Sequence, residues 1–171
     1  MPHQLTPSEL EAINSFPQAA EEFCHLIENE SGYTRRQFVE NVLIYLSKLW
    51  ALGSQLPDVE PATAGNDFSD EEVKRHSERC IKLSNTLRIK LGDLDTYWSV
   101  FNPTKQEQST PTSLSVDLAE IYMDLKEAVK LLASSKHIND IYWEWGFAFR
   151  EHWARHAVEA LKVTLFISPL A

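Results

Sequence analysis

The chain has 171 residues, of which 43% are hydrophobic and 24% are charged, a composition typical of one ordinary globular domain. Its 25 acidic and 16 basic side chains give a formal charge of −9, which disfavours broad binding to nucleic-acid backbones or anionic membranes. No export signal or membrane-spanning apolar run is visible, and Cys24 and Cys80 lack zinc-site spacing. These features predict a single cytoplasmic domain over residues 1–171, with reduced thiols and with neither nucleic acid nor membrane as a partner.

Helix-start signals divide the first half of the chain into three predicted helices. The segment Thr6–Glu9 places a hydroxyl at the N-cap and proline at the first helical position, and this helix is expected to break or kink at Pro17. Capping boxes at Thr34–Gln37 and Ser69–Glu72 open the next two helices, which should run to about Gly53 and Leu91. Between the predicted helices, 54–68 and 102–112 are polar, proline-containing segments and are predicted loops.

Two more helices are predicted in the second half, one capped by Ser113 or Ser115 and one from about Ile138 to Phe166. No segment shows the alternation of a strand. Projected at about 100° per residue, the last helix is apolar on two opposite faces, one with Trp145, Phe149, His152 and His156 and the other with Trp143, Phe147 and Leu161. The sequence therefore predicts an all-α, single-domain bundle of about five helices with a central, largely buried C-terminal helix.

His152 and His156 are four residues apart on the last predicted helix, so both rings should lie within reach of one ion. The segment HWARH lacks the glutamate that follows the first histidine in the HExxH zinc-protease motif, so carboxylates must come from another helix. Asp117 and Asp124, on one edge of the fourth helix, are the candidates. Two interpretations remain open: a metal or small-ligand site, hydrolytic or not, or buried structural histidines bonded to backbone, a carboxylate or Tyr122. We favour the structural interpretation, and we predict no resident cofactor, a divalent metal being the alternative.

Aromatic residues crowd the last predicted helix. They indicate either internal burial or contact with a second protein, since large rings serve both purposes. The interface candidates are Trp143, Phe147, Trp153 and Leu161. A homodimer through this helix is the expected form of such contact.

The third predicted helix is strongly basic. From Lys74 to Lys90 it has six basic residues and one acid, Glu78, so this segment carries +5 and the remainder of the chain −14. A basic face on an acidic protein suits an acidic partner or a phosphorylated ligand. The simpler interpretation, which we favour modestly, is a solvated face that pairs with the protein's own acids.

Sequence motifs for catalysis are absent. The chain has no phosphate loop, dinucleotide-binding glycine motif, nucleophile elbow or CxxC pair. Ferritin-like di-iron sites need repeated ExxH, which is also missing. Enzyme interpretations are therefore left without a specific signal, and the balance leans away from an enzyme.

Four segments resemble a bacterial family, the domain of unknown function 5063. They are LPDVEP (56–61), YWSVFNP (97–103), SLSVDLAEIYMDLK (113–126) and WEWGFAFREHWARHAVEAL (143–161). The sequence departs from the family pattern at Asn102, where an acid is expected, and at Gly146 and Ala154. The resemblance implies a small bacterial helical protein of unassigned activity, with no catalytic residues to transfer.

Three functions follow as expectations. The first is a non-enzymatic helical domain that contacts an unknown protein partner. The second, from a different class, is a metal- or ligand-binding bundle that uses Asp117, Asp124, His152 and His156. The third is an inhibitor or immunity-type protein, because a small acidic helical protein can mask a basic partner.

Overall fold

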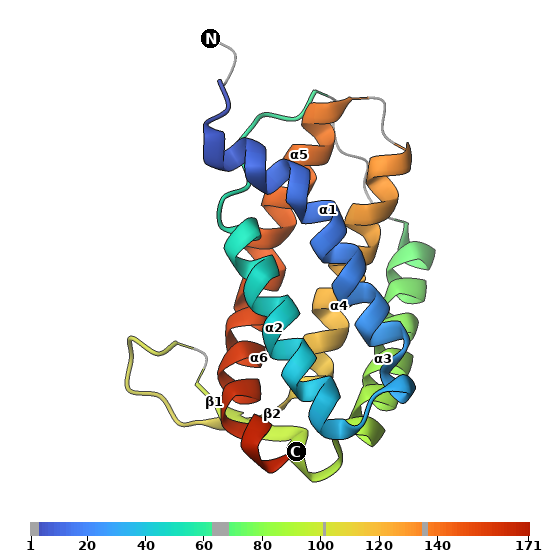
Figure 1. The fold of residues 1–171 in the computed structure, drawn as a ribbon, viewed down its shortest axis with the longest axis vertical. Helices are drawn as coiled ribbons and strands as arrows, with labels where there is room; N and C mark the ends of the chain where they lie inside the picture. Colours follow the sequence, from blue (N-terminus) through green and yellow to red (C-terminus); the bar gives the residue numbers. More distant parts are fainter. Residues whose placement is uncertain (1–3, 63–68, 101, 135–136) are drawn as a thin grey trace.

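The computed structural model describes residues 4–62, 69–100, 102–134 and 137–171, which form a helical bundle (Figure 1). Its four long helices are α1 (Pro7–Glu28), α2 (Arg35–Gly53), α3 (Asp70–Leu91) and α4 (Leu114–Ser134). A C-terminal rod follows, made of α5 (Ile138–Ala148), a π-turn (Phe149–Trp153) and α6 (Ala154–Ile167) in unbroken succession. Short 3₁₀-helices occupy Glu30–Gly32, Gly92–Leu94 and Ser168–Leu170. The predicted all-α fold of about five helices is confirmed.

The first three helices begin where the sequence predicts. In each capping box the side chain of Thr6, Thr34 or Ser69 accepts a hydrogen bond from the backbone three residues later. The helix that was predicted to break or kink at Pro17 does not break there, since α1 continues through this residue. Phe16 and Ala20 on either side are almost fully buried, so packing outweighs the hydrogen bond that proline removes.

A two-stranded hairpin was not predicted. In it β1 (Thr96–Ser99) pairs antiparallel with β2 (Thr110–Ser113), in the register Thr96 opposite Ser113. The end of the predicted loop 102–112 is therefore strand, whereas residues 54–62 of the predicted loop 54–68 contain no helix or strand and 63–68 lie outside the described residues. Strands of four residues are too short for a clear alternation of apolar and polar positions.

Asp95, the residue before β1, fixes the start of α4. The backbone nitrogen of Ser115, in the first turn, donates to the buried carboxylate of Asp95 at 2.7 Å. The side chains of Ser113 and Ser115 take no part in this bond, so the cap that the sequence placed locally is supplied from 20 residues earlier in the chain.

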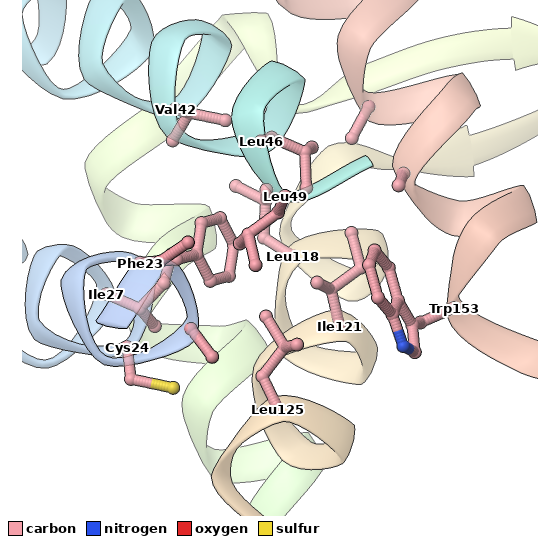
Figure 2. Close-up of a cluster of buried hydrophobic side chains, with 14 of the residues drawn as sticks. Phe23, Cys24, Ile27, Val42, Leu46, Leu49, Leu118, Ile121, Leu125 and Trp153 are labelled. Carbon is pink, nitrogen blue, oxygen red and sulfur yellow. The ribbon is translucent and has the colours of Figure 1, made fainter. Parts of the chain in front are cut away.

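The core lies where α1, α2, α4 and the C-terminal rod meet. Figure 2 shows side chains from all four meeting in it, each at most 1% exposed: Phe23, Ile27, Leu46, Leu49, Ile121, Leu125 and Trp153. In contrast, α3 lies at the edge of the bundle and packs mainly against α4 (Figure 1). It buries only a narrow strip: Cys80, Ser84, Leu87 and Leu91.

The C-terminal rod is buried on one side only, so the prediction of a central, largely buried helix is wrong. Trp145, Phe149 and Trp153 face the core, but Phe147 is 45% exposed and Leu165 62% exposed. Residues four apart drift by about 40° per step on an ideal α-helix. The wider π-turn offsets this drift and keeps Trp145, Phe149 and Trp153 on the core side, whereas the projection assumed a uniform helix.

No helix in the described ranges combines the length and apolar character that crossing a membrane requires.

Candidate functional site

The four residues singled out by their spacing meet between α4 and the C-terminal rod, in two pairs. His152 Nδ1 lies 2.7 Å from Asp124 Oδ2, and His156 Nδ1 lies 2.8 Å from Asp117 Oδ1. The centres of the two imidazole rings are 5.1 Å apart, with an angle of 72° between their planes. The two carboxylates are two helical turns apart on α4, whereas the two histidines that they contact are one turn apart on the rod. We call these four residues the twin dyad.

Tyr97 joins the twin dyad from strand β1. Its hydroxyl donates to Asp117 Oδ2 at 2.5 Å, so this buried carboxylate has a partner on each oxygen. Burial and the hydrogen bond to Asp117 both raise the pKa of Tyr97, which keeps the hydroxyl protonated as a donor. Sequence reasoning missed Tyr97 because it did not predict the hairpin; its place in the YWSVFNP segment was the available signal.

The two histidines are not core residues, which corrects the interpretation that we favoured. The side chain of His152 is 45% exposed and that of His156 is 30% exposed, whereas their carboxylate partners are largely buried. They are bonded to carboxylates, as expected of structural histidines, but Tyr122 is elsewhere and donates to Glu28. The π-turn explains the exposure, since it rotates His152 away from the buried face on which a uniform helix would place it.

The surroundings of the twin dyad are acidic. The hydrogen bond to Asp124 raises the pKa of His152, and the charges of Asp124 and Glu120 add to this effect. Burial, with a contribution from the charge of Asp124, raises the pKa of Glu144. Acids therefore gather around an exposed pair of imidazoles, an environment that favours cations over anions.

The cysteines take no part in this chemistry. Both are free and buried, and burial raises the pKa of Cys24 and of Cys80 to about 12. At neutral pH neither is a thiolate, so neither is a nucleophile or a ready metal ligand. In the described part of the chain, no three or more His, Cys, Asp or Glu side chains are arranged to hold a metal ion.

The four interface candidates have different surroundings. Trp153 is 1% exposed and packs on Phe149, so it belongs to the core and cannot form an interface. Leu161 is half-buried and packs against the core. Trp143 is half-buried and stacks on the exposed Phe147, with ring centres 4.9 Å apart. Of the four candidates, only Trp143 and Phe147 therefore offer an aromatic surface to solvent.

A groove of about 340 Å³ runs between α3 and α4, and we call it the basic groove. Four of its lining residues are cationic and one is acidic; the whole set is Arg79, Lys82, Leu83, Thr86, Tyr122, Met123, Lys126, Glu127 and Lys130. The sequence predicted the basic face of α3, but the lysines of α4 were not recognised as its continuation. The groove therefore combines basic residues from two segments about 40 residues apart in the chain.

The cations of the basic groove differ in how they are paired. Lys126 binds Glu28 at 2.5 Å, and Lys130 lies 2.6 Å from Glu127. Among the residues that the structure describes, Arg79 and Lys82 form no ion pair, so the expected pairing of the α3 face with the protein's own acids does not extend to these two. Their charges are open to an incoming anion.

Comparison with known proteins identifies the family. The family model described as domain of unknown function (DUF5063) matches residues 8–168. The fold is similar to that of the crystal structure of protein BF1032 from Bacteroides fragilis, with a TM-score of 0.71, 22% identity and 91% of each chain covered. No curated protein matches the chain. The resemblance found in the sequence is confirmed, and this chain belongs to the DUF5063 family.

Proposed function

We propose that this protein is a non-enzymatic interaction domain that binds an acidic segment of a partner protein in the basic groove. The observation that carries the proposal is the concentration of four cations against one acid in a single groove, on a chain whose formal charge is −9. Such a local reversal of sign attracts an acidic partner to one place on the surface. Arg79 and Lys82, which form no ion pair with any described residue, are the main attracting charges.

The floor of the basic groove is apolar, which favours a peptide with apolar and acidic side chains over a ligand that carries charge alone. Leu83 and Tyr122 are half-buried there, and Met123 is 4% exposed. An apolar side chain of the partner can pack on this floor, while its carboxylates pair with the cations along the edges. The acidic remainder of the chain repels the long phosphate backbone of a nucleic acid, so a short acidic-apolar segment fits best.

Fluorescence anisotropy tests the proposal. The probe is a labelled short peptide of glutamates and leucines, titrated with the full chain at low salt. Arg79→Glu combined with Lys82→Glu should weaken binding by roughly tenfold or more, since both attracting charges are reversed. The control, Lys74→Glu combined with Arg75→Glu, makes the same charge change on exposed positions of α3 outside the groove and should have a much smaller effect.

Two results would contradict the proposal: no binding of the peptide at low salt, or equal weakening by the two double variants. A single-stranded oligonucleotide of equal charge forms the second arm of the experiment. Tighter binding of the oligonucleotide than of the peptide would identify the groove as a nucleic-acid site instead.

A homodimer is a second proposal, supported by the outer face of the C-terminal rod. Val158, Leu165 and Phe166 are 47%, 62% and 73% exposed, which is high for large apolar side chains. Sedimentation equilibrium should give twice the chain mass at micromolar concentration, and Leu165→Glu should return it to that of a monomer. A monomeric mass for the unmodified protein would contradict the dimer and leave the groove proposal intact.

We also propose a bacterial, cytoplasmic protein. Two free, buried thiols and no disulfide suit a reducing compartment, and the similar crystal structure comes from a bacterium.

A further inference from the structure

We propose that the twin dyad binds one divalent transition-metal ion between the Nε2 atoms of His152 and His156. Both Nδ1 atoms face carboxylate oxygens, at 2.7 and 2.8 Å. An imidazole that donates from Nδ1 to a carboxylate keeps the lone pair of Nε2 free, which is the form in which histidine binds metals. In the described part of the chain neither Nε2 forms a hydrogen bond, so neither atom is already engaged by another residue.

The separation of the rings fits one shared ion. Two imidazoles that bind one tetrahedral zinc through Nε2, at about 2.0–2.1 Å, place their ring centres about 5 Å apart. The ring centres of His152 and His156 are 5.1 Å apart. Their four-residue spacing along the rod sets this distance, and the two carboxylates hold the rings in place.

Charge and exposure also favour a cation at this position. Asp117 and Asp124 contact the rings at their Nδ1 atoms. Glu144 and Glu120 are close enough to interact electrostatically with Asp124 and His152, respectively. The histidine side chains are 45% and 30% exposed, so an ion can reach them from solvent. The carboxylates make the imidazoles stronger ligands and offset the charge of the ion.

The proposed site is open and exchangeable. Only two protein ligands take part, consistent with the absence of a three-ligand group in the described residues, so water completes the coordination. Imidazole suits zinc, nickel and copper, and magnesium and calcium prefer oxygen ligands. The site should therefore select the first group over the second.

Isothermal titration calorimetry with zinc chloride on the full chain tests this inference. One ion should bind per chain, and His152→Ala or His156→Ala should each weaken binding at least tenfold because the chelate is lost. His25→Ala, which removes an exposed histidine of α1, is the matched control and should leave the affinity unchanged. Asp124→Asn keeps the ligand and removes its carboxylate partner, so a loss of roughly 10- to 100-fold is expected.

A second readout separates ligation from a purely structural role. Zinc should raise the melting temperature of the unmodified protein but not of the combined His152→Ala and His156→Ala variant. Circular dichroism checks that the variant is folded. No binding at millimolar zinc, or equal binding by the combined variant, would overturn the inference. Arg79→Glu with Lys82→Glu should bind zinc normally, so this test is independent of the basic groove.

Discussion

The two edges of α4 have opposite chemistry. Toward the C-terminal rod, Asp117 and Asp124 are largely buried and each is paired with a histidine. Toward α3, Lys126 and Lys130 are 37% and 50% exposed and line the basic groove. The difference follows from the neighbouring elements. The rod packs on the core, which buries the carboxylates that face it. In contrast, α3 packs at the edge of the bundle and leaves the cations of α4 that face it exposed to water.

This comparison separates contacts that stabilise the fold from charges that are available to a partner. Charges removed from water must keep their hydrogen-bond partners, and losing one is costly. Charges in water contribute little to stability but set the local potential. Substitutions on the two edges should therefore affect different measurements.

The largest effect should come from Asp117. Asp117→Ala leaves Tyr97 and His156 without their shared acceptor, so the free energy of unfolding should fall by about 2–4 kcal/mol. Urea denaturation measures it. Tyr97→Phe removes only one of the two bonds and should cost less. If Asp117→Ala lowered the free energy of unfolding by no more than a surface substitution does, the edge of α4 that faces the rod would not stabilise the fold.

The substitution Gly53→Ala tests the attachment of the rod to α2. A Cβ atom there would lie 2.5 Å from Cδ2 of Phe149, in the π-turn, and the overlap should destabilise the protein by about 1–3 kcal/mol. Gly32→Ala is the control, because a Cβ there meets no atom within 4 Å. Equal melting temperatures for the two variants would show that the rod yields easily at this contact.

The pH dependence of stability tests the edge next to the groove. The hydrogen bond from Lys126 lowers the pKa of Glu28, with a further contribution from Tyr122. Because the folded pKa lies below the unfolded value, this stability is present above the unfolded pKa, near 4.5, and is lost as the pH falls through the folded pKa. Glu28→Gln should flatten that part of the acid-denaturation curve. An unchanged curve would show that the ion pair contributes nothing measurable.

The smallest effect on stability is expected at Lys82. Lys82→Ala should change the free energy of unfolding by less than about 0.5 kcal/mol, because the side chain is exposed and forms no ion pair in the described residues. It should still weaken binding of the acidic peptide about two- to fivefold. Anisotropy and thermal melts of the same sample measure both quantities. A marked loss of stability without a loss of binding would show that Lys82 stabilises the fold and does not attract the partner.

The sequence predicted what local chemistry determines. Capping boxes located the starts of three helices, and helical spacing brought together Asp117, Asp124, His152 and His156. What it missed depends on contacts between distant segments. The hairpin that carries Tyr97 has strands of only four residues, and the π-turn leaves no pattern in hydrophobicity. That one turn accounts for the error about burial of the rod and for the exposure of the histidines.

Mapping of amide chemical shifts tests the central claim, that an acidic segment docks between α3 and α4. The acidic peptide is titrated into ¹⁵N-labelled protein at low salt. The amides that shift most should lie in α3 around Arg79–Thr86 and in α4 around Tyr122–Lys130, and higher salt should reverse the shifts. Shifts concentrated on the C-terminal rod, or none at all, would contradict the account.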